Sequence, residues 1–230
     1  TSTFEGVCRS LHNWVTLGGQ NLIGVGTHLK FYISNVGNYN DVTPIRATVS
    51  LSNPFTTVSG SAVVTVTDAN GGYQDGDYVT FSNASAVGGL TIDGEFVVSL
   101  SVTTAANSYN ITASSNATSS ATGGGTVSAA YQINVGNPFA VPIEGWGASS
   151  WGSGAWNVGE SSTTAIRFFS QSNFGEDLIF GNNGGSIFYW DATGSVTTRA
   201  VLLSTLSGAS DVPVVQNLIL VSDISRFVFC

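Results

Sequence analysis

Few residues in this 230-residue chain have the chemistry of a catalytic or metal-binding site. His12 and His28 are its two histidines, and neither has an acidic neighbour in the sequence. A catalytic or metal-binding histidine needs charged or polar partners that orient it. We therefore interpret both histidines as structural residues.

Glu176, Asp177 and Asp191 are the acidic residues that could form the carboxylate pair of a glycoside hydrolase. Asp177, however, begins an apolar segment in the way that Asn21 and Asn217 begin two similar segments, which indicates a role at the start of a strand. The chain has no Gly-x-Ser-x-Gly, phosphate-binding loop or Cys-x-x-Cys motif. We expect no catalytic residue and predict that the chain is not an enzyme.

Four oxygen-bearing residues, Asp68, Asn70, Asp75 and Asp77, lie close together in a glycine-rich segment and could offer ligands to calcium. Their spacing matches no twelve-residue calcium loop, and Asp-Gly and Asn-Gly are common turn formers. The sequence therefore predicts turns here, and we expect no metal and no cofactor.

The composition limits the possible partners. Charged residues make up 9% of the chain, against roughly 25% in a typical globular protein. The net charge is −8 and Lys30 is the single lysine, so a basic stripe that could grip DNA is absent. No run of 18 apolar residues occurs, and we expect no membrane insertion. Cys8 and Cys230 match neither a disulfide framework nor a zinc signature; packed free thiols are favoured, and a pairing stays open.

Three segments, 21–33, 177–190 and 217–229, share one pattern: an apolar strand, a short polar turn and an aromatic-rich second strand. The last two begin about 40 residues apart, and a common β-propeller blade takes roughly 40 to 50 residues. The first two begin about 156 residues apart, which is too long for one blade and requires an insertion. The repeat predicts an all-β chain that forms part of a β-propeller.

Two Asn-Pro-Phe triplets, 53–55 and 137–139, bracket a Ser/Thr/Gly-rich stretch that supplies this insertion. It is predicted to be a small β-barrel or sandwich module over 54–133, with propeller blades over 1–53 and 134–230. Its predicted strands are 63–67, 78–81, 94–98, 108–112 and 127–133.

The segment 144–156 carries three tryptophans, Trp146, Trp151 and Trp156, five residues apart and interleaved with glycine. These indoles could form a stacking platform for sugars or an interface anchor. They could also be the small core of a loop folded over the propeller, and we favour that interpretation because tryptophan is usually well buried.

Several sequence segments resemble those of the tail nozzle, or packaged-DNA stabilisation, proteins of short-tailed bacteriophages. They are Ser-Leu-His-Asn-Trp-Val at 10–15, the segments 21–32 and 39–46, and later 173–179 and 187–191. The tryptophan–glycine stretch at 145–156 is similar to marine members of that family.

The resemblance implies a β-propeller subunit that forms a ring with other copies, a hexamer, at the distal end of the virion tail. Such a ring closes the DNA channel until ejection, contacts tail adaptor and fibre or needle proteins, and lets DNA pass without specific binding. Family members are commonly longer, and the chain ends within an apparent strand, so we expect a segment of a longer protein with further blades missing. No catalytic residue carries over from the family.

A carbohydrate-binding adhesin, such as a receptor-binding tail component, is the alternative. It is suggested by the tryptophan–glycine stretch and by the inserted module, which could both project from a surface.

Overall fold

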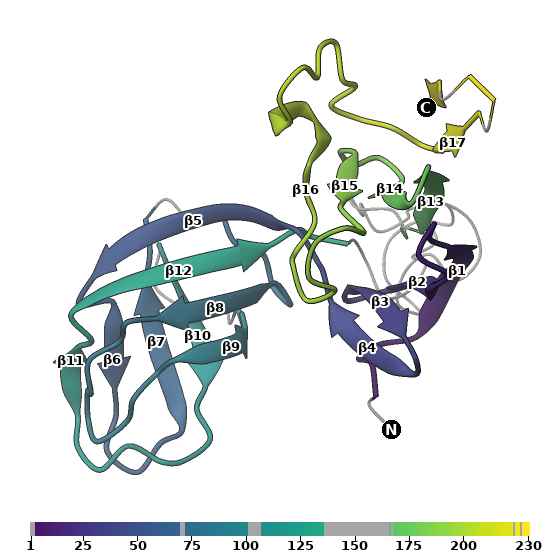
Figure 1. Cartoon of the computed structure of the whole chain (residues 1–230). Coiled ribbons are helices and arrows are strands. Elements are labelled where there is room, and N and C mark those ends of the chain that lie inside the picture. The colour runs from purple at the N-terminus through teal and green to yellow at the C-terminus, as the bar shows by residue number, and fades with distance from the viewer. Residues whose placement is uncertain are drawn as a thin grey trace, which may run out of the picture. The chain divides into compact units, whose positions relative to one another are not determined.

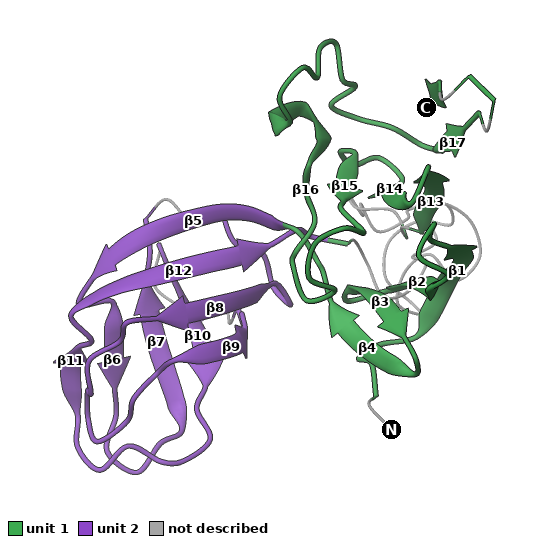
Figure 2. Cartoon of the chain, viewed as in Figure 1, with its two compact units in different colours: residues 1–44, 135–230 green, residues 45–134 purple. Residues whose placement is uncertain are grey.

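The computed structural model describes residues 3–69, 72–100, 107–135, 166, 168–222, 224–225 and 227–230. In this part of the chain all regular elements are β-strands except one 3-10 turn, Leu203–Thr205 (η1). The predicted all-β class is confirmed. The chain forms two compact units, which Figure 2 colours separately: unit 1 is Thr1–Pro44 with Val135–Cys230, and unit 2 is Ile45–Asn134.

Unit 2 is a sandwich of two antiparallel four-stranded sheets (Figure 1). Its strands are β5 Ile45–Ser52, β6 Phe55–Thr57, β7 Val63–Thr67, β8 Tyr78–Ser82, β9 Gly94–Val97, β10 Ser108–Thr112, β11 Ala121–Gly123 and β12 Thr126–Gln132. One sheet has the order β5-β12-β8-β9 and the other the order β10-β7-β6-β11.

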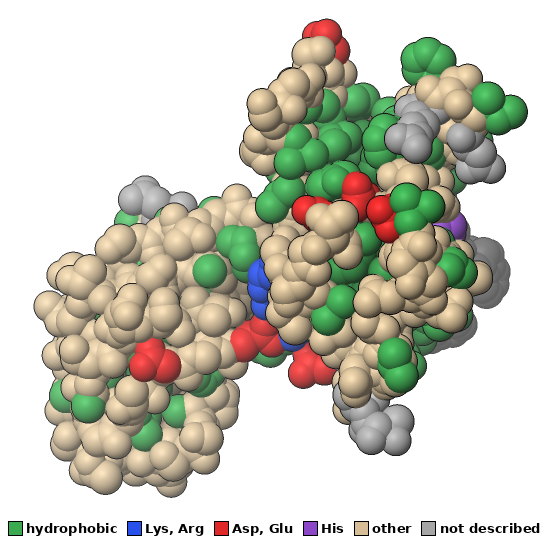
Figure 3. All heavy atoms as spheres, viewed as in Figure 1, with side chains coloured by type: hydrophobic (Ala, Val, Ile, Leu, Met, Phe, Trp, Pro, Cys, Tyr) green, Lys and Arg blue, Asp and Glu red, His purple; other side chains and the backbone are tan. Residues whose placement is uncertain are grey.

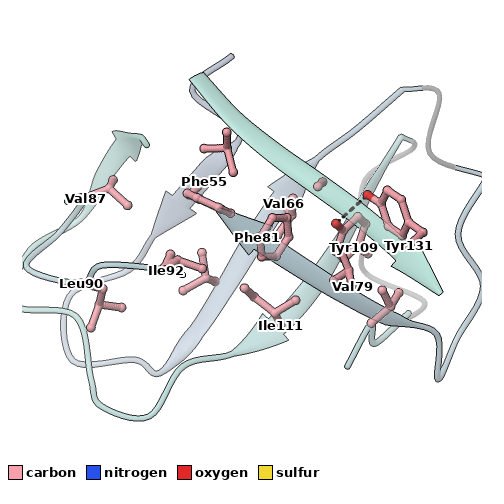
Figure 4. Packing of buried hydrophobic residues seen from close by; sticks show 14 of the residues in the cluster. Phe55, Val66, Val79, Phe81, Val87, Leu90, Ile92, Tyr109, Ile111 and Tyr131 are labelled. Atoms are coloured by element: carbon pink, nitrogen blue, oxygen red, sulfur yellow. Dashed lines mark hydrogen bonds between the residues drawn. The ribbon is translucent and has the colours of Figure 1, made fainter. Parts of the chain in front are cut away.

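The core of unit 2 follows from the alternation of side chains along its strands. On β12, Val127, Ala129 and Tyr131 are fully buried, because every second residue of a strand points to the same face. Side chains from both sheets point into this core (Figure 4), and the rings of Phe55 and Phe81 meet edge to face with centroids 5.1 Å apart. The two sheets therefore share one continuous apolar interior.

The five predicted strands of the insertion all form, as β7, β8, β9, β10 and β12. Three that the sequence did not predict are β5, which alternates clearly, and β6 and β11, which are only three residues long. The start of the unit also differs from the predicted 54, because β5 pairs with β12 from Ile45 to Ser52. The chain thus enters and leaves unit 2 along two neighbouring antiparallel strands.

The described residues of unit 1 form three antiparallel sheets, each with its strands in chain order. Sheet 1 comprises β1 Cys8–Val15, β2 Asn21–Thr27, β3 Phe31–Asn35 and β4 Asn38–Asp41. Sheet 2 comprises β13 Phe169–Phe174, β14 Asp177–Asn182, β15 Phe188–Trp190 and β16 Val201–Leu202, and sheet 3 comprises β17 Leu220–Val221 and β18 Val228–Phe229.

The three predicted hairpins are confirmed as β2–β3, β14–β15 and β17–β18. The first turn shows how the polar residues act: Thr27 Oγ1 accepts the backbone N–H of Lys30 at 2.9 Å and donates to its carbonyl at 3.0 Å. A hydroxyl group that satisfies both backbone groups holds the chain in a tight turn. Among the described residues the sheets stay open, with no closed propeller or barrel.

Candidate interaction surface of unit 1

Sheets 1 and 2 pack face to face through aromatic rings. Phe31 on β3 lies parallel to Phe180 on β14, with ring centroids 3.8 Å apart, and the indole of Trp14 meets that of Trp190 edge to face at 6.3 Å. Trp14 Nε1 also donates to the carbonyl of Glu176 at 2.7 Å. Buried aromatic pairs of this kind add to the stabilisation that burial alone provides. The joint therefore fixes sheet 2 on one defined face of sheet 1.

A glycine on β2 lets the first strand of sheet 2 approach closely. A side chain at Gly24 would overlap the amide of Gln171 on β13, and one at Gly26 would lie 2.8 Å from Phe169 Cβ. In the space left by Gly24, Gln171 Nε2 donates to Ser10 Oγ at 3.0 Å. A Gly-x-Gly strand facing a glutamine is therefore the close contact between sheets 1 and 2.

A related contact joins sheet 2 to the segment just before sheet 3, where Gln216 bridges to Gly185. A side chain at Gly181 on β14 would overlap the carbonyl of Ser186 and the amide of Gln216. Gln216 Nε2 donates instead to the carbonyl of Asn182 at 2.9 Å. Gln171 and Gln216 are about 45 residues apart, which is within the roughly 40 to 50 residues of a propeller blade.

Backbone anchoring places β17 on β13. The N–H of Ile219 donates to Ser170 Oγ at 2.8 Å, and that of Val221 donates to Ser172 Oγ at 3.2 Å. β17 thus lies against the first strand of sheet 2, as β13 lies against β1 and β2. The third hairpin, β17–β18, therefore corresponds to the first two strands of sheets 1 and 2. Its shared sequence pattern had instead aligned it with β2–β3 and β14–β15, which are the second and third strands of those sheets. Three sheets stack in chain order, first strand on first strand.

A charged cluster ties sheet 1 to the loop that follows β15. Lys30 Nζ lies 3.5 Å from both Glu5 Oε2 and Asp41 Oδ2, and the lysine side chain is 6% exposed. Arg199 Nη2 is 3.2 Å from Asp41 Oδ2, and its Nη1 donates to the carbonyl of Thr43 at 2.7 Å. The single lysine is therefore engaged inside the unit, and a nearly buried cation of this kind requires its carboxylates.

The outer faces of the stack are apolar and partly exposed. On sheet 1, the face turned away from sheet 2 carries Leu11, Val15 and Ile23, and Leu11 is 67% exposed, whereas Val25 and Tyr32 on the same face are buried. On sheet 3, Leu220 and Phe229 pair across the two strands, and each is 58% exposed. Hydrophobic side chains also gather over the upper part of unit 1 in Figure 3, whereas few hydrophobic or charged side chains are visible on the face of unit 2 shown there. Apolar sheet faces of this kind fit the packing of another sheet.

The two histidines make contacts that suit structural residues. His12 Nε2 lies 3.3 Å from Asn173 Oδ1, and its ring stacks on Trp14. His28 Nδ1 accepts the backbone N–H of Val7 at 2.9 Å. Burial, and then the charge of Arg9, lower the pKa of His28.

The structure brings Asp177 beside the residue that follows Asp191, because Asp177 Oδ1 accepts the backbone N–H of Ala192 at 2.9 Å, and each of the three candidate carboxylates has protein partners. Glu176 Oε2 accepts a backbone N–H from the β1–β2 turn at 2.9 Å. Asp177 accepts the hydroxyl of Tyr189, and burial and this bond raise the pKa of Tyr189. Asp191 accepts both the hydroxyl and the N–H of Thr193, which lower the pKa of Asp191. The strand-start interpretation of Asp177 agrees with its position as the first residue of β14.

The aspartates considered for calcium have separate protein partners. Asp68 accepts the hydroxyl of Tyr131 at 2.6 Å, Asp77 pairs with Arg46 at 2.8 Å, and Asp75 accepts a backbone N–H at 2.7 Å. The described residues contain no group of three or more His, Cys, Asp or Glu side chains that could hold a metal ion.

Some residues singled out in the sequence lie outside the described residues. They are Asn70, Trp146, Trp151 and Trp156. Cys8 and Cys230 are both free, and Cys230 is exposed instead of packed, which corrects that part of the prediction. The Gly–Gln contacts were not predicted from the sequence, although the Gly-Val-Gly of β2 is a visible signal of close approach.

Comparisons with known proteins add little. No protein-family model and no curated protein matches the chain. Among solved structures, an endosialidase of phage phi92 is similar at 18% identity and a TM-score of 0.35, over 83% of this chain and 30% of that chain. The chain thus spans under a third of that protein, and a similarity this weak supports no conclusion on fold or function. No helix in the described ranges has the length and apolarity to cross a membrane.

Proposed function

We propose that this chain is a structural component of a short-tailed bacteriophage tail, a nozzle subunit that assembles into a ring and closes the DNA channel until ejection. In this proposal the chain is not an enzyme. Unit 1 contributes part of a β-propeller to the ring, and unit 2 is an inserted module. Tail adaptor and fibre or needle proteins are the proposed neighbours.

The observation that carries the proposal is the stack of three sheets in unit 1. Successive sheets pack first strand on first strand, with Gln171 against Gly24 between sheets 1 and 2 and Val221 on Ser172 Oγ between sheets 2 and 3. A propeller repeats one such step around an axis and provides a rigid wedge for a ring. The exposed apolar faces at both ends of the stack offer the surfaces on which further sheets would pack.

The charge of the chain supports a role beside DNA without binding to it. The net charge is −8, and Lys30, the only lysine, is engaged with Glu5 and Asp41. A negatively charged wall repels the phosphate backbone, so DNA can move through without adhering.

Cryo-electron microscopy of the virion that carries this chain tests the proposal. We expect the stacked sheets of unit 1 in a six-fold ring at the distal end of the tail. Location in the capsid, or outside the particle, would contradict it. Native mass spectrometry of the purified chain gives a second test: Leu11→Asp, on the free face of sheet 1, should abolish rings, whereas Thr80→Asp, on an outward position of β8, should not.

A carbohydrate-binding tail adhesin is the second candidate, and the outer face of unit 2 favours it. Asn110, Thr65, Thr56 and Thr122 lie side by side across all four strands of one sheet. Thr65 Oγ1 donates to Asn110 Oδ1 at 3.1 Å, and the hydroxyls of Thr56 and Thr122 are 3.0 Å apart. Such a row of hydroxyl and amide groups could bind sugar hydroxyls.

Glycan-array binding by the whole chain distinguishes the two candidates. An adhesin should bind a host polysaccharide and lose that binding in Thr56→Val/Thr65→Val, while Thr48→Val/Ser50→Val on the other sheet should retain it. Absence of binding to every host glycan would remove this candidate.

A further inference from the structure

We propose that β5 is a pairing edge through which two copies of this chain associate, β5 to β5 in antiparallel orientation, to form one continuous eight-stranded sheet. The inference concerns unit 2 alone and does not depend on the proposed function. β5 is the terminal strand of its sheet, and no described strand pairs with its other side.

The β5 edge lacks the features that usually protect a sheet edge. It is eight residues long and contains no proline and no lysine, and its only charge is Arg46. Its pairing with β12 is regular from Ser52 to Ala47, and the irregularity lies at the Ile45 end, between Tyr131 and Gln132. A long, regular edge strand is a ready template for another strand.

The other strand edges are shorter or modified. β9 and β11, also at the ends of their sheets, have four and three residues. Asn110, in the middle of the edge strand β10, forms a bridge with Ser99. β1, the other eight-residue edge strand, has a register shift between Cys8 and Ser10. Like β1, β5 has a register shift near one end, at Ile45, but Ala47–Ser52 pair with β12 without interruption, which makes β5 one of the long regular edges among the described strands.

The sequence of β5 suits pairing with itself. Residues alternate strictly between partly buried and exposed positions, with Ala47, Val49 and Leu51 on the core side and Thr48 and Ser50 on the outer side. A two-fold axis at Val49 sets Ala47 opposite Leu51 of the second copy, and Thr48 opposite Ser50 of the second copy. Directly opposite residues in an antiparallel pair share a face, so the apolar row and the hydroxyl row are both continued.

The partial burial of the β5 side chains and the pairing of its one charged residue also favour a second copy of β5 as the partner. Val49 and Leu51 pack against the core of unit 2 but remain partly exposed at its edge. A second β5 would cover them with apolar side chains and satisfy the outward backbone groups. Arg46 is already paired with Asp77 at 2.8 Å, so the two strands bring no uncompensated like charges together.

Analytical ultracentrifugation of the full chain tests this pairing. We expect a reversible dimer at concentrations up to about 0.1 mM, and Thr48→Lys/Ser50→Lys should weaken it by at least about tenfold, because the new charges face each other across the two-fold axis. The matched control, Thr80→Lys/Ser82→Lys, makes the same charge change on the interior strand β8 and should leave the dimer intact. A wild-type chain that stays monomeric over this range, or a dimer insensitive to the β5 change, would overturn the proposal.

Cross-linking locates the contact without relying on a destabilising variant. In a Cys8→Ser/Cys230→Ser background, Thr48→Cys/Ser50→Cys should form a disulfide-linked dimer on mild oxidation, since those positions oppose each other. Thr80→Cys/Ser82→Cys should stay monomeric under the same conditions. Equal cross-linking of both variants, or none at β5, contradicts pairing at this edge.

Discussion

Unit 2 and unit 1 bury the apolar faces of their sheets in different ways. In unit 2 two sheets close on each other, and a single core holds buried residues from both, among them Phe55, Phe81 and Tyr109. In unit 1 each sheet packs on the next, and the ends of the stack leave Leu11 and Leu220 exposed. A sandwich is complete with two sheets, whereas a stack always has a further face to cover.

Because of this difference, the two units should be stabilised by different contacts. Unit 2 has its own core and its own polar network, which makes it able to fold as a module. Unit 1 depends on contacts between successive sheets, such as Phe31 against Phe180 and the N–H of Val221 on Ser172 Oγ. Changes in the core should therefore affect unit 2 alone, and changes at the sheet joints should affect unit 1 alone.

The largest effect is expected for Phe81→Ala in the unit 2 core. Phe81 is 1% exposed, and removing its ring leaves a cavity between the sheets, which should lower the free energy of unfolding of unit 2 by about 3 to 5 kcal/mol. Hydrogen exchange measured by mass spectrometry should show unit 2 amides losing protection and unit 1 amides unchanged. Val97→Ala, at an exposed position, is the control, and equal loss in both units would disprove their independence.

Gly181→Ala should have the next largest effect, in unit 1. The added methyl would overlap the backbone carbonyl of Ser186, which cannot rotate away, so we expect a loss of about 3 kcal/mol, at the upper end for overpacking. Thermal unfolding and exchange at β17 should report it. At Gly194 the nearest atom to an added methyl would be 3.7 Å away, so Gly194→Ala should hardly change the stability of unit 1. If both alanines behave alike, the close approach of the chain at Gly181 does not contribute to the stability of unit 1.

Asp41→Ala should destabilise unit 1 by about 2 kcal/mol, because it leaves Lys30 and Arg199 without their shared carboxylate. The effect is below that of a fully buried pair, since the side chains of Asp41 and Arg199 are 22% and 31% exposed. Chemical denaturation measures it. Glu5→Ala removes the more exposed partner of the same lysine and should cost less; the reverse order would refute the assignment of Asp41 as the centre of the cluster.

Alkaline pH should destabilise unit 2 through its buried tyrosines. The hydroxyls of Tyr109 and Tyr131 are 2.7 Å apart, and burial is the main cause that raises the pKa of both. Because the folded pKa lies above the unfolded value of about 10, the stabilisation is fully present below pH 10 and is lost as the pH rises beyond it. At pH 11 each tyrosine should cost about 1.4 kcal/mol.

Thermal melts between about pH 8 and pH 11, a range that spans the tyrosine pKa in the unfolded chain, would measure this loss of stability. Tyr109→Phe removes one ionisable group and should make the decline shallower. A variant with the same pH dependence as the wild-type chain would show that this tyrosine is not responsible.

Local pattern was enough to predict much of the fold. Alternating β-branched and aromatic residues predicted β7 and β10 with their observed bounds, and the polar turns between apolar runs predicted all three hairpins of unit 1. These features depend on neighbours in the sequence, so a sequence can reveal them. For the same reason the sequence did not reveal β6 and β11, each only three residues long.

The candidate interaction surface of unit 1 was harder to predict from the sequence. Leu11 and Leu220 look like core residues in the sequence, and only the stack shows that they lie on its outer faces. The pairing of Gln171 with Gly24 joins residues far apart in the chain, and no local pattern connects them.

The sequence by itself determined the all-β class, the hairpins, the presence of an insertion and the scarcity of residues for chemistry, because composition and short-range periodicity carry that information. Only the tertiary structure decided that β5 belongs to unit 2 and that the third hairpin begins with a first strand. It also decided that Lys30 is engaged within unit 1. Those outcomes depend on which sheet packs on which, and long-range packing is set by the whole fold.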